Sequence, residues 1–403
     1  MTTRASSSKQ ANHFPLDPSC EGSRGSYQII FGRKQTSSIH SMRKISNIII
    51  RSIGALAMTG LAACDLIHDD SIAPCEYRLR FVYDYNMKFA DAFQKEVDKA
   101  ALFICDDKGN FIQRRDIEGA ELKANNIVMD LAPGTYQVLT WAGLDNRSYE
   151  WPELTPETSS LEEIRVKTLR AGDATQPNEL TPLWHALDTL VITGDQHEEK
   201  EISLAKNTNK LRIVLQDTDG NSMDAKNFTF RITANNGYMD YDNQLLADPA
   251  ITYLPYYQKS VDIAVGDSLN GKPTNRYVAV AEMNTMRLMA GENYRLVIRH
   301  KDWEKDVLNV NLNNYLLLTQ MEGHNISAQE YLDRQDEYSI IFFLTPSYCP
   351  DCPPVDPVDP VDPVDPVDPV DPIIPDPEVP IVGYSCYKIQ VKDWVIRLNH
   401  GEL

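Results

Sequence analysis

Alternating apolar and polar side chains mark much of the chain after residue 76. Tyr77, Leu79 and Phe81 alternate with two arginines, which gives a strand one apolar face and one polar face. Further alternating stretches lie at 211–215, 228–232 and 295–299. The run YSIIFFL at 338–344 is apolar on both faces and predicts a central strand.

Helical patterns are few. Phe89, Phe93 and Val97 are spaced by four residues and predict a helix over 87–100. Ser327 and Glu330 form a capping-box pattern, which predicts a short helix ending near Arg334. The remaining strands and turns predict an all-β fold with minor helix, and strand runs of this kind favour β-sandwiches.

Two groups of strands are expected, because the polar Asn207-Thr208-Asn209 precedes a fresh alternating strand. We predict an N-terminal sandwich over 75–205 and a C-terminal sandwich over 206–345, completed by 381–403. Between these last two segments, 346–380 repeats Val-Asp-Pro. Proline every third residue excludes helix and sheet, so the repeat predicts an extended linker or loop.

The last residues form a tail strand, predicted over 386–399. Ile389 and Val391 lie at odd positions, whereas Trp394 and Ile396 lie at even positions. One extra residue near Asp393 would restore a single apolar face, so we predict one strand with a β-bulge there.

The N-terminal region predicts a lipoprotein signal peptide over 42–63. Met42 opens a short basic start, and the uncharged run that follows is too short to span a bilayer. The run ends in a lipobox of Leu61, Ala62, Ala63 and Cys64. We expect a peptidase to cut before Cys64 after its thiol has been lipidated.

Two expectations follow from lipidation at Cys64. Residues 1–41 are Ser-rich and aperiodic, and are predicted to be untranslated or disordered, with Met42 as the start. The mature chain would begin with an acidic tether over 64–74, anchored by lipid to the outer membrane and exposed on the cell surface. The covalent lipid is the only expected cofactor.

Charge and residue types exclude several functions. A formal net charge of -19 repels nucleic acid, so no nucleic-acid partner is expected. The histidines are scattered without catalytic or metal-ligand spacing, and His185 has the sequence context of a structural histidine. We therefore predict no enzyme activity, no catalytic residues and no metal site.

Cys349 and Cys352 have the spacing of redox and zinc motifs, but the further ligands or fold that such motifs need are not visible. A disulfide between one of them and Cys386 is the favoured interpretation. Such a bond would join the two ends of the proline-rich segment.

Several segments carry a family resemblance, among them YRLRFVYDYNMKFADAF, LAPGTYQVLTWAGLDN, QEYLDRQDEYSIIFFL and IQVKDWVIRLN. The chain resembles the FimB-type fimbrial anchor subunits of Bacteroidales, the lipoprotein anchors of type V pili, over nearly all of 64–403. The resemblance implies two tandem transthyretin-like β-sandwich domains. It also implies that the protein binds a fimbrial stalk subunit, attaches the fimbrium to the outer membrane and limits its growth.

Two questions stay open from sequence. The tail strand either closes the second sandwich, which we favour because an open sandwich exposes a strand edge, or inserts into a stalk subunit. The alternative function is a surface adhesin that captures carbohydrate or a host protein. Its aromatic side chains would then lie on exposed loops such as 252–257, where packing against the second sandwich is the other interpretation.

Overall fold

The computed structural model describes residues 76–194, 197–265, 274–303, 306–321, 325–348, 381–391 and 394–397. The chain divides into two compact units. Among the described residues, the smaller unit holds 76–78, 128–134, 192–194 and 197–200, and the larger unit holds all others. Within the described residues, none of the helices is long and apolar enough to cross a membrane.

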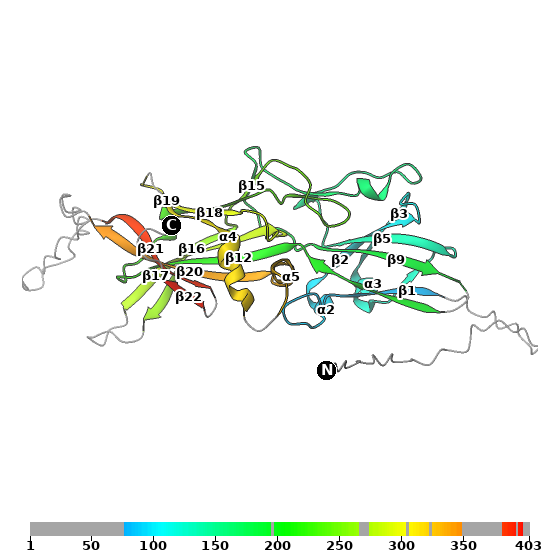
Figure 1. The fold of residues 1–403 in the computed structure, drawn as a ribbon, viewed down its shortest axis with the longest axis horizontal. Coiled ribbons are helices and arrows are strands. Elements are labelled where there is room, and N and C mark those ends of the chain that lie inside the picture. The colour runs from blue at the N-terminus through cyan, green and yellow to red at the C-terminus, as the bar shows by residue number, and fades with distance from the viewer. Residues whose placement is uncertain are drawn as a thin grey trace, which may run out of the picture. The chain divides into compact units, whose positions relative to one another are not determined.

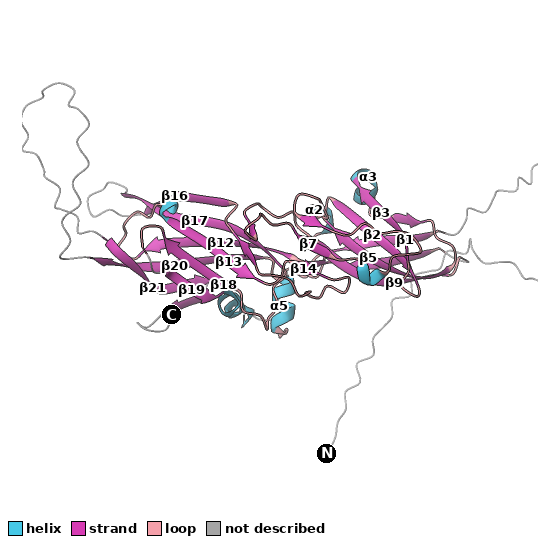
Figure 2. Ribbon diagram, turned by 90° about the horizontal axis from the view of Figure 1, so that it is seen from above, coloured by secondary structure: helices cyan, strands magenta, loops and turns pink. Residues whose placement is uncertain are grey.

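Strands form most of the structure, as Figures 1 and 2 show, which confirms the predicted all-β class with minor helix. Two sheets are built mainly from the first half of the chain. A three-stranded sheet has the order β10 (Glu198–Ser203), β1 (Tyr77–Val82), β4 (Ile127–Met129). A five-stranded sheet has the order β11 (Ala205–Lys206), β9 (Trp184–Ile192), β5 (Gly134–Ala142), β2 (Lys99–Asp106), β3 (Phe111–Glu118).

Three further sheets complete the fold. A six-stranded sheet has the order β16 (Tyr257–Val265), β17 (Thr274–Met286), β12 (Thr208–Asp217), β20 (Glu337–Tyr348), β21 (Ile381–Val391), β22 (Trp394–Arg397). A five-stranded sheet has the order β19 (Asp306–Asn311), β18 (Arg295–His300), β13 (Phe228–Ala234), β15 (Ile251–Tyr253), β8 (Thr175–Gln176). A three-stranded sheet has the order β14 (Tyr238–Met239), β7 (Val166–Thr168), β6 (Tyr149–Glu150).

Helices are short throughout the described part of the chain. The α-helices are α2 (Phe93–Glu96), α3 (Gly119–Ala124), α4 (Leu312–Leu316) and α5 (Ala328–Arg334). The 3-10 helices are η3 (Leu161–Glu163), η4 (Ala225–Asn227) and η5 (Leu317–Met321). The predicted short helix is confirmed as α5, whose N-cap Ser327 accepts a hydrogen bond from the backbone N–H of Glu330. The Glu330 carboxylate accepts a hydrogen bond from Arg334 Nε, so only the Ser327 half of the expected capping box is shown.

The predicted helix over 87–100 is wrong. Only the single turn α2 is helical, and β2 already begins at Lys99. Side chains hold the preceding backbone in another shape: Asp91 Oδ1 accepts hydrogen bonds from the backbone of Tyr83 and Phe93, and Asn86 Nδ2 donates to Ala90 O. Such side-chain bonds to the backbone compete with helix formation, so the spacing of apolar residues was not decisive.

The predicted central strand is confirmed as β20. It runs parallel to β12, with Ile340 opposite Ile213, and antiparallel to β21 on its other side. Phe342 is fully buried, whereas Phe343 on the opposite face is half-buried with Lys388 Nζ at 3.6 Å from its ring centroid. Both apolar faces are therefore used, one in the core and one under a lysine side chain.

The tail joins this sheet as two strands, so the prediction of one bulged strand is wrong. β22 pairs antiparallel with β21, with Ile396 opposite Ile389 and Trp394 opposite Val391. Directly opposite residues share a face of the sheet, so this pairing itself requires the apolar residues to change from odd to even positions. A register shift does occur elsewhere in β21, at the exposed Tyr387.

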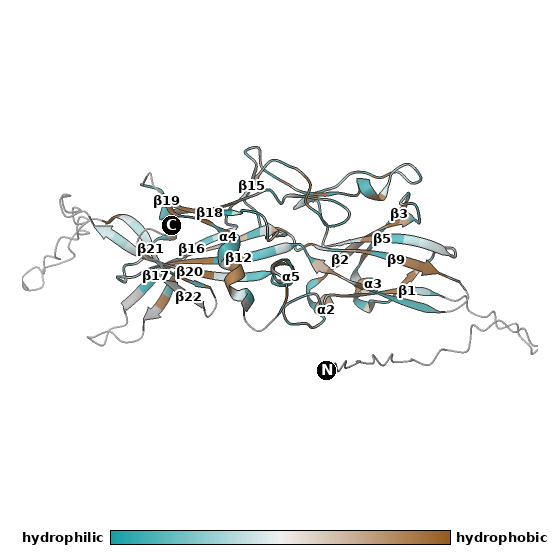
Figure 3. Cartoon of the chain, viewed as in Figure 1, coloured by the Kyte–Doolittle hydropathy of each residue, from teal (hydrophilic) through white to brown (hydrophobic). Residues whose placement is uncertain are grey.

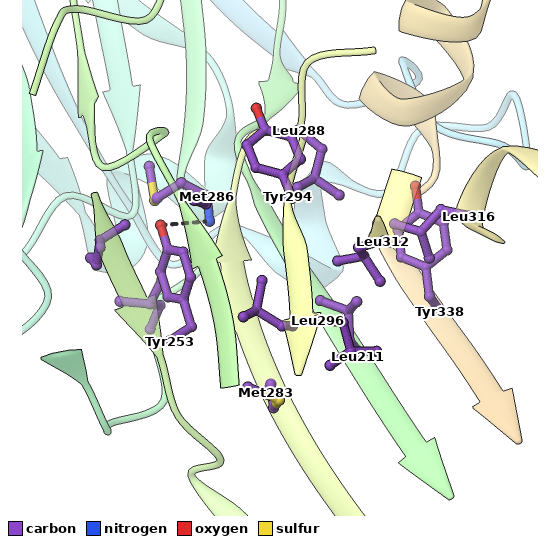
Figure 4. Packing of buried hydrophobic residues seen from close by; sticks show 14 of the residues in the cluster. Leu211, Tyr253, Met283, Met286, Leu288, Tyr294, Leu296, Leu312, Leu316 and Tyr338 are labelled. Atoms are coloured by element: carbon purple, nitrogen blue, oxygen red, sulfur yellow. Dashed lines mark hydrogen bonds between the residues drawn. The ribbon is translucent and has the colours of Figure 1, made fainter. Parts of the chain in front are cut away.

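One continuous cluster of buried side chains runs from residue 101 to residue 391. Figure 4 shows part of it, where the hydroxyl of Tyr253 accepts a hydrogen bond from the backbone N–H of Met286. Figure 3 shows hydrophobic stretches in brown along the strands, such as the end of β9. Strands from before and after residue 205 share two sheets, since β7 pairs with β14 and β8 with β15. The domain boundaries stay a prediction.

His185 lies buried on β9, in keeping with a structural role. Its ring packs edge-on against Trp141, with the ring centroids 4.8 Å apart, and its Nε2 lies 2.8 Å from Tyr241 O, where it donates a hydrogen bond. Burial lowers the pKa of His185 from 6.5 to about 4, because the cationic ring would lose its hydration.

The first prediction tests whether the tail strand completes the core. Ile389 is fully buried, so Ile389→Ala should lower the free energy of unfolding by about 2–5 kcal/mol. Tyr387→Ala is the control on the same strand: with a side chain 45% exposed, it should change stability by about 0.5 kcal/mol or less. Urea denaturation measures both. If Ile389→Ala lowers the free energy of unfolding no more than Tyr387→Ala does, the tail strand does not contribute to the core as predicted.

The second prediction concerns pH. His185 binds a proton more readily in the unfolded chain than in the folded one, so its contribution to stability is complete above pH 6.5. About 3 kcal/mol should be lost as pH falls from 6.5 to about 4. His185→Gln retains an N–H donor for Tyr241 without this titration. The difference in free energy of unfolding between wild type and variant should therefore change by about 3 kcal/mol between pH 7.5 and pH 4. If the free energies of the two proteins change in parallel with pH, the prediction is refuted.

Candidate functional site

The predicted lipid-attachment site lies outside the described residues. This holds for Cys64 and for the lipobox residues Leu61, Ala62 and Ala63. Cys349 and Cys352 also lie outside them. Lipidation therefore stays a prediction.

Cys386 is a free, buried thiol on β21. It lies opposite Leu344 of β20, and its Sγ is 3.8 Å from the carbonyl oxygen of Lys388. The disulfide to Cys349 or Cys352 stays a prediction, because both of these residues lie outside the described part of the chain. Burial raises the pKa of this thiol to about 12, so it stays protonated at neutral pH and packs as a small apolar side chain.

The candidate tail residues divide between two strands. Ile389 and Val391 are buried in the core from β21, and Trp394 and Ile396 lie opposite them on β22. Among the described strands, β22 pairs only with β21, so it forms one edge of the six-stranded sheet. The sequence correctly indicated apolar residues here but not that they form an edge.

The two edges of this sheet differ in chemistry. β16 forms the other edge and carries the exposed charges Lys259 and Asp262, which protect an edge against pairing with a further strand. β22 has the sequence Trp-Val-Ile-Arg, which is mostly apolar. β22 is thus the better candidate for accepting a strand from another protein.

The aromatic segment 252–257 does not form an exposed loop. Tyr253 is buried on β15 and donates a hydrogen bond to Asn236 Oδ1 at 2.9 Å (Figure 4 shows the ring among its apolar neighbours). Tyr257 begins β16 and is 40% exposed. Packing is therefore the better interpretation of this segment.

A different aromatic group lines a cleft of about 460 Å³ on β6, β7 and β14. Lys167 lies opposite Glu150 on one neighbouring strand and Tyr238 on the other, so these three side chains form a row on one face. Their neighbours along the strands, such as Val166, are buried on the opposite face. The cleft lining also includes Trp151, Glu163 and Arg165. We call this the three-strand cleft.

An ion-pair group next to the three-strand cleft includes Lys167, one of the residues that line it. The buried Asp248 pairs with Arg170, and Lys167 Nζ lies 3.5 Å from Asp248 Oδ1. Arg170 also donates to the carbonyl oxygen of Pro249 at 2.7 Å. Gly237 precedes Tyr238, and a Cβ there would lie 2.5 Å from Arg170 Nη2, so any larger residue would require the Arg170 guanidinium to shift.

A second cleft, of about 480 Å³, is polar and internally paired. Lys206 Nζ lies 2.8 Å from Glu96 Oε2 and 2.5 Å from Asp336 Oδ2. Burial opposes the charge of Lys206, but the two carboxylates outweigh this and raise its pKa. Lys206 is therefore a structural cation that ties β11 to the segments before β2 and β20.

Catalytic groups were not expected, and the described residues contain no group of three His, Cys, Asp or Glu side chains that could hold a metal ion. The expectations of no enzyme activity and no cofactor stay predictions. No local sequence pattern indicates the three-strand cleft, because Trp151 and Tyr238 lie far apart along the chain. Only the pairing of β7 with both neighbours brings them together.

Comparisons with known proteins identify one matching family and several solved structures of similar fold. The family of fimbrillin-A associated anchor proteins Mfa1 and Mfa2 matches residues 72–400. Among solved structures, a Bacteroides thetaiotaomicron protein described as a candidate polysaccharide-binding protein shares 30% identity, with a TM-score of 0.64, over 82% of this chain and 100% of its own. A candidate adhesin from the same organism shares 31% identity, with a TM-score of 0.64, over 81% and 99%.

A more distant structure shows the same fold. The fimbrial anchor protein Mfa2 from Porphyromonas gingivalis shares 17% identity, with a TM-score of 0.55, over 81% of this chain and 99% of its own. The comparison with curated proteins gave no match.

Proposed function

Because the chain belongs to the family of fimbrillin-A associated anchor proteins Mfa1 and Mfa2, which confirms the resemblance to fimbrial anchors, we propose that it is the lipid-anchored base subunit of a fimbrium. In this role it attaches the fimbrium to the outer membrane through lipid on Cys64. It binds a fimbrial stalk subunit by strand pairing and thereby limits elongation. The expected location is the cell surface.

The position of β22 at the edge of its sheet, among the described strands, carries this proposal. An exposed strand edge presents backbone N–H and C=O groups that a strand of a partner can pair with, and side-chain contacts then set specificity. β22 offers such an edge with a mostly apolar sequence, next to β21, whose Ile389 and Val391 are buried. In the proposed arrangement the stalk subunit pairs with this edge, while the lipid is attached at Cys64. A subunit bound in this way cannot extend the fimbrium further.

Membrane attachment rests on the sequence of the lipobox. Stable anchoring takes two or more acyl chains, which bacterial lipoproteins carry on their first cysteine. The acidic residues that follow Cys64 suit a solvated tether.

The third prediction tests lipid attachment. Cys64→Ala removes the acceptor thiol, so the protein should appear as an uncut precursor or be shed in soluble form. Membrane fractionation with immunoblotting measures this. Cys75→Ala is the matched control, because it removes a nearby thiol outside the lipobox and should leave fractionation unchanged. A Cys64→Ala protein that stays in the outer membrane like wild type would contradict lipidation.

The fourth prediction tests the β22 edge. A chain truncated after Val391 retains the buried Ile389 and Val391 and should therefore stay folded, with a melting temperature lowered by the loss of the pairing between β22 and β21. It should no longer retain stalk subunits in a pull-down from detergent extracts, because the edge strand is gone. A chain truncated after Arg397 keeps β22 and is the control. Equal retention by the two truncated chains would exclude β22 as the contact.

Adhesion is a second candidate function. The two relatives that are 30% and 31% identical are described as a candidate polysaccharide-binding protein and a candidate adhesin. The three-strand cleft gives this function a place on the described surface. Adhesion and anchoring are compatible, since the cleft and β22 are separate structures.

A further inference from the structure

We propose that the three-strand cleft binds a neutral oligosaccharide. This inference rests on adhesion, the second of the proposed functions, and not on the anchor role. A volume of about 460 Å³ lies within the usual range of small-ligand sites. Its lining combines partly exposed aromatic rings with charged groups of both signs.

The aromatic side chains fit the shape of a sugar. A pyranose ring has an apolar face of C–H groups and a rim of hydroxyl groups. Tyr238 and Trp151 are both half-buried, so part of each ring remains open to the solvent. Such amphipathic rings offer an apolar surface and a polar atom to the same ligand. Lys167 Nζ lies over one face of the Tyr238 ring, 5.6 Å from its centroid, and places a hydrogen-bond donor at that ring.

The charges favour a neutral ligand. Glu150 and Glu163 are balanced by Arg165 and Lys167 in the cleft lining. Sugar hydroxyls both donate and accept hydrogen bonds, so they can bond to carboxylates and to cationic groups, and such charge-assisted bonds are the strong ones. An acidic glycan would gain no net attraction from this balanced cleft. It would also be repelled by a protein with a net charge of -19.

The geometry disfavours an extended peptide. A peptide that adds to a sheet needs a strand edge of several residues, and the edge strands β6 and β14 are two residues long. Strand pairing holds the backbone at Tyr238, because β14 pairs with β7 and the Thr168 N–H donates a hydrogen bond to Gly237 O at 2.8 Å. Little ordering of this backbone would be needed on binding.

The experiment measures binding of defined sugars to the purified full mature chain by isothermal titration calorimetry. The neutral probes are mannohexaose, cellohexaose and laminarihexaose, and the acidic probe is sialyllactose. At least one neutral probe should bind and sialyllactose should not. Tyr238→Ala should weaken that binding about tenfold through loss of the aromatic contact. Glu150→Gln keeps the side-chain shape and should weaken it several-fold through loss of a charge-assisted bond.

Tyr277→Ala is the matched control, because Tyr277 on β17 is 44% exposed and does not line the cleft. It should bind like wild type, and melting curves should show all variants folded. Failure of every neutral probe, or binding of sialyllactose alone, would overturn the proposal. Undiminished binding in both cleft variants would overturn the site while leaving adhesion intact. Loss of binding in both variants with unchanged bacterial adhesion would support the site and refute the adhesive function.

Discussion

The parallel pairing of β12 with β20 is the constraint on which the rest of the C-terminal half depends. Ile213 lies opposite Ile340, and Leu215 opposite Phe342, all four buried. Parallel strands cannot be joined by a tight turn, so the residues between them must leave the sheet and return. They do so as β13, β15, β18 and β19, which form the second sheet over the core, and as β16 and β17, which extend the first. The tail strand β21 can then pair only with the remaining side of β20.

This arrangement gives the tail two separate tasks. β21 contributes Ile389 and Val391 to the core and is therefore part of the folded protein itself. β22, with the mostly apolar sequence Trp-Val-Ile-Arg, is the last described strand of this sheet. The fold thus separates β21, which contributes buried residues to the core, from β22, which lies at an edge of the described sheet.

Pairing across residue 205 matters for the same reason. β7 and β8 precede that position, yet they pair with β14 and β15 that follow it. A largely buried ion pair between Arg170 and Asp248 reinforces these connections. Removing one partner of such a pair leaves an uncompensated buried charge, which is strongly destabilising. The three-strand cleft is built on one of these shared sheets, so its side chains are held by both halves of the chain.

The sequence by itself determined the features that depend on near neighbours. Alternation within β1, β12, β13 and β18 and the short helix α5 with its N-cap Ser327 could be predicted, because each depends on a few consecutive residues. The family could also be predicted, since its motifs recur in order along the chain. The helix over 87–100 could not be excluded, because Asn86 and Asp91 bond to the backbone in ways that spacing does not reveal.

Only the tertiary structure decided which strands pair with one another. The apolar change from Val391 to Trp394 fits a bulge and a hairpin equally, and only pairing with β21 distinguishes them. Aromatic content drew attention to 252–257, although Tyr253 is buried, whereas Trp151 and Tyr238 meet only through β7. Which strands pair depends on how much apolar surface they bury together with segments that are distant in the sequence. A local pattern of residues does not carry this information.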